Sequence, residues 1–188
     1  MLRGSPGPIA ESGRLTTVRL AIISDTHMPK GPRALPPGCL ERLRAADAIL
    51  HAGDLSTLGV LRELEALGPL VHAVHGNVDE AAVRRVLPER RVIELDGVRV
   101  AMVHDAGPSA GRLARLRRAF PDVDAVVFGH SHLPLHETDP DGNFQIFNPG
   151  SPTERRRSPR HTMGEGLIRG GRLALGLVAL DQGPANDE

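Results

Sequence analysis

Residues 18–27, Val18-Arg19-Leu20-Ala21-Ile22-Ile23-Ser24-Asp25-Thr26-His27, contain the pattern on which the rest of the chain is built. The first part is apolar enough to form a buried strand, and the carboxylate of Asp25 and the imidazole of His27 follow where that strand should end. Binding sites in open α/β sheets lie in the crevice outside the carboxyl ends of the strands. The stretch therefore predicts a strand that carries two metal-ligand side chains to one edge of a sheet.

Four later segments repeat this arrangement of an apolar strand followed by polar ligands. Strands expected at 48–52, 70–75, 98–103 and 124–128 end at Gly53-Asp54, Gly76-Asn77, His104 and Gly129-His130-Ser131-His132. The candidate ligands are thus Asp25, His27, Asp54, Asn77, His104, His130 and His132. Gly53, Gly76 and Gly129 each lie beside a candidate ligand, where a sharp turn or a close backbone approach is required.

The candidate ligands comprise two carboxylates, one amide oxygen and four imidazoles, and they include no thiolate. This mixture suits Mn, Fe, Zn, Ni or Co better than a structural zinc site built from cysteines. Seven ligands are too many for one tetrahedral ion. With one carboxylate bridging, they suit two divalent metal ions.

The composition restricts the class of protein. The 188 residues suffice for one domain with a sizeable core. The net charge is zero and Trp and Tyr are absent, which argues against an electrostatic attraction to nucleic acid or an anionic membrane and against an aromatic platform for bases. The single cysteine, Cys39, excludes an internal disulfide and fits a reducing cytosol. We therefore expect a cytoplasmic protein with no membrane partner and no stable nucleic-acid complex, while a homo-oligomer stays open.

The remaining pattern predicts an α/β domain over residues 18–180, with tails at 1–17 and 181–188. Apolar spacing and turn residues predict helices near 38–46, 58–67, 79–87 and 109–120. Asp96-Gly97 predicts a hairpin of strands 91–95 and 98–103, and a second hairpin is expected over 135–147. Residues 153–165 are expected to be irregular, and the last strands are expected at 166–169 and 172–180.

The five ligand blocks, in this order and at strand ends, resemble the calcineurin-like metallophosphoesterase superfamily. The short chain and the segment Asn148-Pro149-Gly150-Ser151 more closely resemble its small, YfcE-like phosphodiesterase branch. The resemblance covers about residues 18–180. It implies a four-layer αββα sandwich, in which two mixed sheets lie face to face and helices flank them.

The resemblance also implies a role for each ligand. One ion would be held by Asp25, His27, Asp54 and His132, and the other by Asp54, Asn77, His104 and His130, with Asp54 as the bridge. Manganese is the first choice of metal, and iron, zinc, nickel and cobalt are the alternatives. The expected reaction is hydrolysis of a small phosphodiester by a hydroxide that bridges the ions, so that no side chain serves as the nucleophile.

Two positions depart from the pattern of the superfamily. Many members have a histidine directly after the Gly-Asn pair, where it can serve the leaving group, but this chain has Val78. The departure fits the small branch and disfavours substrates with poor leaving groups. Asp105 follows His104 where glycine is usual. Its carboxylate is a candidate to orient His104 or a neighbour, and its negative charge would weaken the binding of anionic substrates.

Three further residues are candidates for contacts around the site. Asp79 is placed either to cap the helix that follows it or to support a ligand from behind. His75, like His51, is expected to be a polar residue near the site. Arg156 belongs to an arginine-rich segment, 155–160, which is either an exposed charged loop or a contact for the phosphate group of a substrate.

Two other functions compete with the phosphodiesterase. A retromer scaffold subunit of eukaryotes is similar in fold but acts through protein surfaces, and a scaffold has no need for all seven ligands. A nuclease acting on short oligonucleotides is the third reading. The zero net charge, the scarcity of aromatic residues and the lack of an evident additional DNA-binding domain argue against it.

Overall fold

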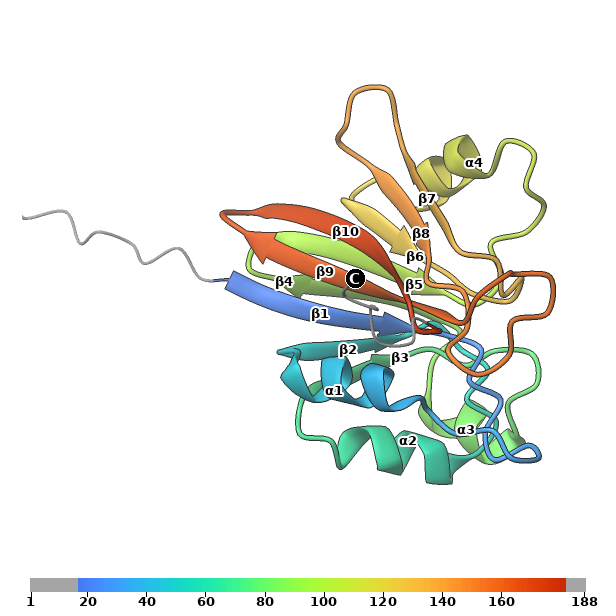
Figure 1. The fold of residues 1–188 in the computed structure, drawn as a ribbon. Helices are drawn as coiled ribbons and strands as arrows, with labels where there is room; N and C mark the ends of the chain where they lie inside the picture. Colours follow the sequence, from blue (N-terminus) through green and yellow to red (C-terminus); the bar gives the residue numbers. More distant parts are fainter. Residues whose placement is uncertain (1–16, 182–188) are drawn as a thin grey trace, which may run out of the picture.

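The computed structural model describes residues 17–181, which form two five-stranded sheets and four helices (Figure 1). The strand order is β10-β9-β1-β2-β3 in the first sheet and β4-β5-β6-β8-β7 in the second. In chain order the elements are β1 (Thr17–Ile23), α1 (Pro37–Ala45), β2 (Ala48–His51), α2 (Leu58–Glu65), β3 (Leu70–Ala73), α3 (Ala81–Val86), β4 (Arg90–Leu95), β5 (Val98–Val103), α4 (Arg112–Ala119), β6 (Ala125–Val127), β7 (Leu135–Thr138), β8 (Gln145–Asn148), β9 (Thr162–Arg169) and β10 (Arg172–Ala179).

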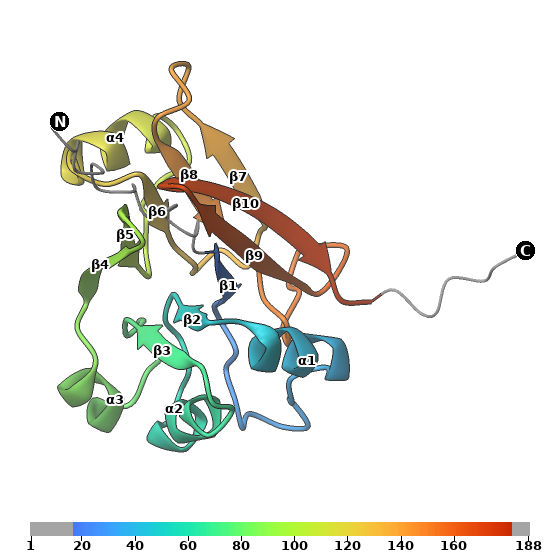
Figure 2. The ribbon, with the colours of Figure 1, turned by 90° about the vertical axis from the view of Figure 1, so that its left-hand side faces the viewer.

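The two sheets pack face to face, and helices cover their outer sides. Helices α1, α2 and α3 lie on the side of β1, β2 and β3, whereas α4 lies beyond the second sheet (Figure 2). Between the sheets, fully buried side chains such as Ile22, Leu50 and Phe147 form one apolar cluster, with separate clusters under the helices. The expected four-layer αββα sandwich of two mixed sheets is therefore confirmed.

Parallel pairing brings the candidate ligands together. Strand β2 pairs in parallel with both β1 and β3, and β5 pairs in parallel with β6. Neighbouring parallel strands end at the same edge, so the loops after β1, β2 and β3 meet at one edge of the first sheet. The loops after β5 and β6 meet at one edge of the second sheet. The candidate ligands lie in these five loops.

The start of β9 differs from the expectation that residues 153–165 are irregular. The strand begins at Thr162, and its pairs with β1 include Ile22 with Gly164. A glycine is unfavourable in a strand by propensity alone. Here a Cβ at position 164 would lie 2.3 Å from Cε1 of Phe147 in the opposite sheet, so the close approach of the two sheets requires glycine.

The fourth helix begins later than the apolar spacing indicates. It starts at Arg112 instead of Ser109, because Gly111 at its N-cap has a left-handed backbone with φ +64°. The expected tails fall almost wholly on residues 1–16 and 182–188, outside the described residues. Asp181, placed by the sequence in the C-terminal tail, accepts hydrogen bonds from the backbone and ring of His161 at 2.7 and 2.6 Å. Among residues 17–181, no helix combines the length and apolar character needed to cross a membrane.

Candidate metal centre

The loops that follow the strands hold their ligands in an uncommon backbone conformation. Five of the seven candidate ligands have a positive φ: Asp25 (+55°), His27 (+45°), Asp54 (+60°), His130 (+69°) and His132 (+58°). Such a conformation costs a residue with a side chain about 1–3 kcal/mol and persists only where the surroundings enforce it. Two backbone hydrogen bonds enforce part of it here, from the Asp25 amide to the Gly53 carbonyl at 2.9 Å and from the His27 amide to the Asp54 carbonyl at 3.0 Å.

Glycines beside the ligands give the ligand side chains their space. A Cβ at Gly76 would lie 2.1 Å from Oδ1 of Asp54, and one at Gly129 would lie 2.7 Å from Oδ2 of Asp25. A Cβ at Gly53 would lie 2.7 Å from Nδ1 of His104. Any larger residue at these positions would have to displace the adjacent ligand or its backbone.

One group of ligands consists of Asp25, His27 and His132, all buried. The Nε2 atoms of the two imidazoles lie 3.1 Å apart. Oδ1 of Asp25 lies 3.4 Å from Nε2 of His132 and 3.9 Å from Nε2 of His27. The three ligand atoms all lie within 4.8 Å of one another, so they can contact one ion.

A second group adjoins the first. Nε2 of His104 lies 3.2 Å from Oδ2 of Asp54 and 3.1 Å from Oδ1 of Asn77, and the same amide oxygen lies 2.9 Å from Nδ1 of His130. Oδ2 of Asp54 also lies 3.7 Å from Nε2 of His27 in the first group. Asp54 therefore lies between the two groups, which is the place that a bridging ligand requires. Asp25 also approaches the second group, because ligand atoms of Asp25, Asp54 and His104 all lie within 4.8 Å of one another.

The backbone fixes the protonation of two imidazoles. Nδ1 of His104 donates to the Ala52 carbonyl at 2.8 Å, and Nδ1 of His132 donates to the Glu154 carbonyl at 2.7 Å. With the proton on Nδ1, the Nε2 atom of each ring faces the carboxylates and is the nitrogen left to bind a metal. This is the tautomer in which an imidazole binds a metal through Nε2. Without a metal, burial lowers the pKa of His104, but the hydrogen bond and charge of Asp54 outweigh burial and raise it.

Electrostatics also favour a cation at this position. Asp25 is fully buried, and burial raises the pKa of its carboxyl group to about 7, although His104 and Ser24 oppose the shift. Burial lowers the pKa of His132 to about 4, so this ring is neutral at pH 7. Burying carboxylates beside neutral imidazoles is unfavourable, and a bound cation compensates this cost. The donor set therefore fits divalent ions.

Asp79 acts on the ligand loops and not as a helix cap. Its carboxylate accepts hydrogen bonds from the amides of Asp54 at 3.1 Å, Ser56 at 2.6 Å and Gly76 at 2.7 Å. The N-cap of α3 is Glu80, which makes no side-chain cap bond. The helix-cap alternative is therefore wrong, and the buried Asp79 side chain holds the loops after β2 and β3 together.

Asp105 is exposed, and its carboxylate accepts the hydrogen bond of the Gly107 amide at 2.7 Å. The Ala52 carbonyl, and not Asp105, orients the ring of His104. His75 is half-buried and lines a cavity of about 380 Å³ together with Asn77 and His104. Its side chain thus lies beside the second group of ligands.

Arg156 bends back toward the site. Its φ of +49° is unusual for arginine, and its Nη1 donates to the His130 carbonyl at 3.4 Å. The side chain of Arg156 is exposed. Burial is the main cause that lowers the pKa of His27 and His132, and the positive charge of Arg156 lowers both pKa values further.

Two further residues support the site: His51, which was expected near it from the sequence, and Ser151, whose contact with Asp25 was not expected. The ring of His51 is fully buried, accepts from the Gly53 amide at 3.2 Å and lies 3.1 Å from Oγ1 of Thr26, and burial lowers its pKa to about 3. The hydroxyl of Ser151 donates to the Asp25 carbonyl at 2.8 Å. The motif Asn148–Ser151 marked this segment in the sequence, but no local pattern indicates that Ser151 would contact Asp25.

A four-layer α/β sandwich with carboxylates and imidazoles gathered at strand ends defines a metallophosphoesterase-type protein. The family model of the calcineurin-like phosphoesterase superfamily domain matches residues 18–166, and the chain belongs to this family. Candidate metal ligands and family membership together indicate a phosphoesterase that uses divalent metal ions.

Relatives of known name agree with this family. A probable metallophosphoesterase of Methanothermobacter thermautotrophicus is 34% identical over 140 residues, which cover 73% of this chain and 78% of the relative. A phosphodiesterase of Methanocaldococcus jannaschii is 25% identical over 146 residues, covering 71% and 83%. The solved structure of vacuolar protein sorting 29 from Cryptosporidium parvum has a TM-score of 0.71 and covers 86% of this chain and 97% of that one. At 18% identity, this last likeness concerns the fold.

Proposed function

We propose that the protein is a binuclear, metal-dependent phosphodiesterase. The observation that carries this proposal is the position of Asp54, whose Oδ2 lies 3.2 Å from Nε2 of His104 and 3.7 Å from Nε2 of His27. One carboxylate is thus within reach of two ions. Asp25, His27 and His132 complete the site of one ion, and Asn77, His104 and His130 complete the site of the other.

The side chains around the centre can hold two ions and leave room for a phosphate ester. When bound, a pair of divalent ions neutralises the charge on phosphoryl oxygens and supplies an activated water for attack on phosphorus. Asp25 and Asp54 offset the charge of the ions, and the Ala52 and Glu154 carbonyls hold His104 and His132 in the binding tautomer. The cavity of about 380 Å³ beside Asn77 and His104 gives room for an ester group.

The residue after Asn77 favours phosphodiesters with good leaving groups. Val78 is 45% exposed, and it carries no proton that could pass to a departing alkoxide. An aryl leaving group needs little protonation, whereas an alkyl one depends on it. We therefore expect aryl diesters to be hydrolysed much faster than alkyl monoesters.

The decisive experiment compares an aryl phosphodiester with its matching monoester. Metal-stripped protein is refilled with Mn²⁺, and turnover is measured for the wild type, for Asp54→Ala and for the control Asp141→Ala, which removes an exposed carboxylate in the β7–β8 turn. We expect diester turnover that requires metal, disappears in Asp54→Ala and persists in Asp141→Ala. Failure of the wild type to bind Mn²⁺ would refute the proposal.

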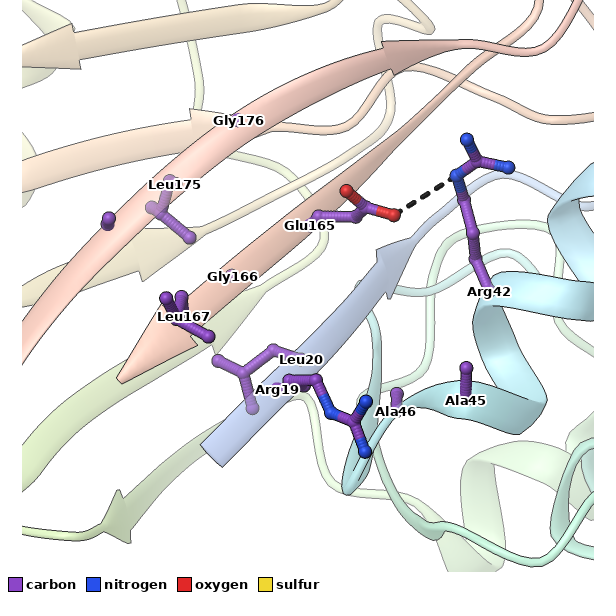
Figure 3. Close-up of a pocket in the computed structure, with 11 residues that line it drawn as sticks. Arg19, Leu20, Arg42, Ala45, Ala46, Glu165, Gly166, Leu167, Leu175 and Gly176 are labelled. Atoms are coloured by element: carbon purple, nitrogen blue, oxygen red, sulfur yellow. Dashed lines mark ion pairs between the residues drawn. The ribbon is translucent and has the colours of Figure 1, made fainter. Parts of the chain in front are cut away.

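A second candidate function is a non-catalytic interaction scaffold. It is favoured by the outer face of β9, where Leu167 is 44% exposed. A cavity of about 510 Å³ lies on this side of the molecule, between β1, β9, β10 and the end of α1 (Figure 3). If the protein binds no metal, the scaffold becomes the better interpretation, whereas two bound ions without turnover of the tested diesters point to a narrower substrate.

A further inference from the structure

Glu154 brings a third carboxylate to the metal centre. Its Oε2 lies 3.7 Å from Nε2 of His27. The carboxylates of Asp54 and Asp25, both candidate ligands, lie 3.7 and 3.9 Å from the same nitrogen. Glu154 is therefore as close to this imidazole as the carboxylates that the strand ends supply.

The separation suits two donors of one ion. Two donor atoms that each lie about 2.1 Å from an ion are about 3.0 Å apart at a right angle and about 4.2 Å apart on opposite sides. The 3.7 Å between Glu154 and His27 falls within this range. Glu154 stands outside the groups whose ligand atoms lie within 4.8 Å of one another, so its side chain must shift toward the ion to complete a shared coordination shell.

The backbone of Glu154 is anchored by hydrogen bonds, and its side chain is held by an ion pair. The amide donates to Oγ of Ser151 at 2.9 Å, and the carbonyl accepts from Nδ1 of His132 at 2.7 Å. The side chain is 25% exposed, and its Oε1 pairs with Nη2 of Arg33 at 2.9 Å. The other terminal nitrogen of Arg33, Nη1, is buried without a hydrogen-bond partner in residues 17–181. Glu154 thus forms an ion pair with this guanidinium, and the pair competes with an ion for the same carboxylate.

We propose that Glu154 is an additional ligand of the ion held by Asp25, His27 and His132, and that Arg33 competes with this ion for the Glu154 carboxylate. The inference rests on the proposed metal centre. It assigns to this ion three carboxylates, from Asp25, Asp54 and Glu154, which favours hard ions such as Mn²⁺ over softer ones. It also assigns opposite effects on the affinity for this ion to Glu154, which binds the ion, and to Arg33, which competes with it.

The size of the effect and its restriction to one ion separate the proposal from an ion pair that acts only through its charges. Burial has the largest effect on the pKa of His27, but charge alone already gives the two partners opposite effects on it, since Glu154 raises this pKa and Arg33 lowers it. If Glu154 is a ligand, Glu154→Gln weakens the binding of one ion, whereas Arg33→Met strengthens it. Arg42 and Glu165 supply a matched control, because they form an ion pair of 3.0 Å on the remote face drawn in Figure 3.

The experiment is calorimetric titration of the full-length, metal-stripped protein with Mn²⁺. In Glu154→Gln we expect the affinity of one of two ions to fall about 10–100-fold, with the other ion unchanged. In Arg33→Met we expect tighter binding of that same ion by about threefold or more, and in Glu165→Gln no change. The ion that stays unchanged also shows that the variant is folded.

The proposal is overturned if both variants weaken binding equally, or if neither changes it. Should Glu154→Gln fail to fold, Arg33→Met decides alone: tighter binding of one ion with the other ion unchanged supports the proposal, and weaker binding, unchanged binding or equal tightening of both ions refutes it. The proposed function fails differently, because in that case the wild type itself does not bind two ions.

Discussion

The Nε2 atoms of His27 and His132 lie 3.1 Å apart, although the two residues are separated by 105 positions in the sequence. Their rings stack with centroids 5.0 Å apart. Burial lowers the pKa of both rings, so they are neutral near pH 7, and Nδ1 of His132 keeps its proton for the Glu154 carbonyl. A divalent ion can join the two nitrogens and the nearby carboxylate of Asp25.

Divalent ions should therefore stabilise the fold. Ligand at about 100 times its dissociation constant adds about 2.7 kcal/mol to the free energy of unfolding, which raises the Tm of a protein of this size by about 5–10 °C. Calorimetric scans of stripped protein with and without Mn²⁺ test this. An unchanged Tm at saturating Mn²⁺ would show that the gathered side chains do not form a metal site.

Asp25→Asn should change how stability depends on pH. In the metal-free wild type the pKa of Asp25 rises from 3.8 to about 7 through burial, so the folded state binds this proton more tightly than the unfolded chain. The Asp25 contribution to stability is thus complete below about pH 4 and is lost as the pH rises toward 7.

The amide side chain of the Asp25→Asn variant cannot ionise and avoids that loss. With metal removed from both proteins, we expect the free energy of unfolding of the variant to exceed that of the wild type by up to about 4 kcal/mol above pH 7. The difference should vanish near pH 4. Urea unfolding of both proteins at several pH values measures this. A difference that is constant with pH would contradict the predicted burial effect.

Gly76→Ala should disable the metal site. The new Cβ would lie 2.1 Å from Oδ1 of Asp54 and 2.6 Å from its backbone nitrogen, so the candidate bridging ligand must move. Gly176→Ala is the matched control, because a Cβ there meets no atom within 4 Å among the described residues. We expect the Tm increase caused by Mn²⁺ to disappear in Gly76→Ala and to remain in Gly176→Ala. Equal increases in the two variants would refute the role of Gly76.

Asp79→Ala should destabilise the metal-free protein. The change removes the acceptor of three backbone amides, those of Asp54, Ser56 and Gly76. An unsatisfied buried donor costs about 1–3 kcal/mol, so we expect a loss of about 3 kcal/mol or more in urea unfolding. Asp105→Ala, which removes one exposed bond to Gly107, should cost less than about 1 kcal/mol. Similar losses in the two variants would be inconsistent with Asp79 as the residue that joins the loops.

The sequence predicted the strand ends well because the same signal serves both fold and site. A buried parallel strand needs a continuous apolar run, and the side chain after that run falls at the edge of the sheet. Asp25, Asp54 and His104 could therefore be placed from the sequence alone. The first residues of β9 could not, because Gly164 is accepted there only through its contact with Phe147 in the other sheet.

The supporting contacts of the site depended on the tertiary structure. Nothing near Asp79 in the sequence indicates that its carboxylate binds the amide of Asp54, 25 residues earlier. The contact of Glu154 with His27 likewise joins two loops far apart in the chain. Periodicity reports which face of an element is buried, but it carries no information on which distant loop will meet a side chain.

The sequence by itself thus determined the type of ligands and their position at strand ends, because these follow from apolar runs and from the residues that end them. The family and the two-sheet architecture came from the resemblance of these motifs to the calcineurin-like metallophosphoesterase superfamily. The tertiary structure places Asp54 between the two ligand groups, as the resemblance implied. Only the tertiary structure decided that Asp79 holds the loops together and that Glu154 adds a carboxylate beside His27. These relationships are distances between loops, and such distances arise only when the two sheets pack against each other.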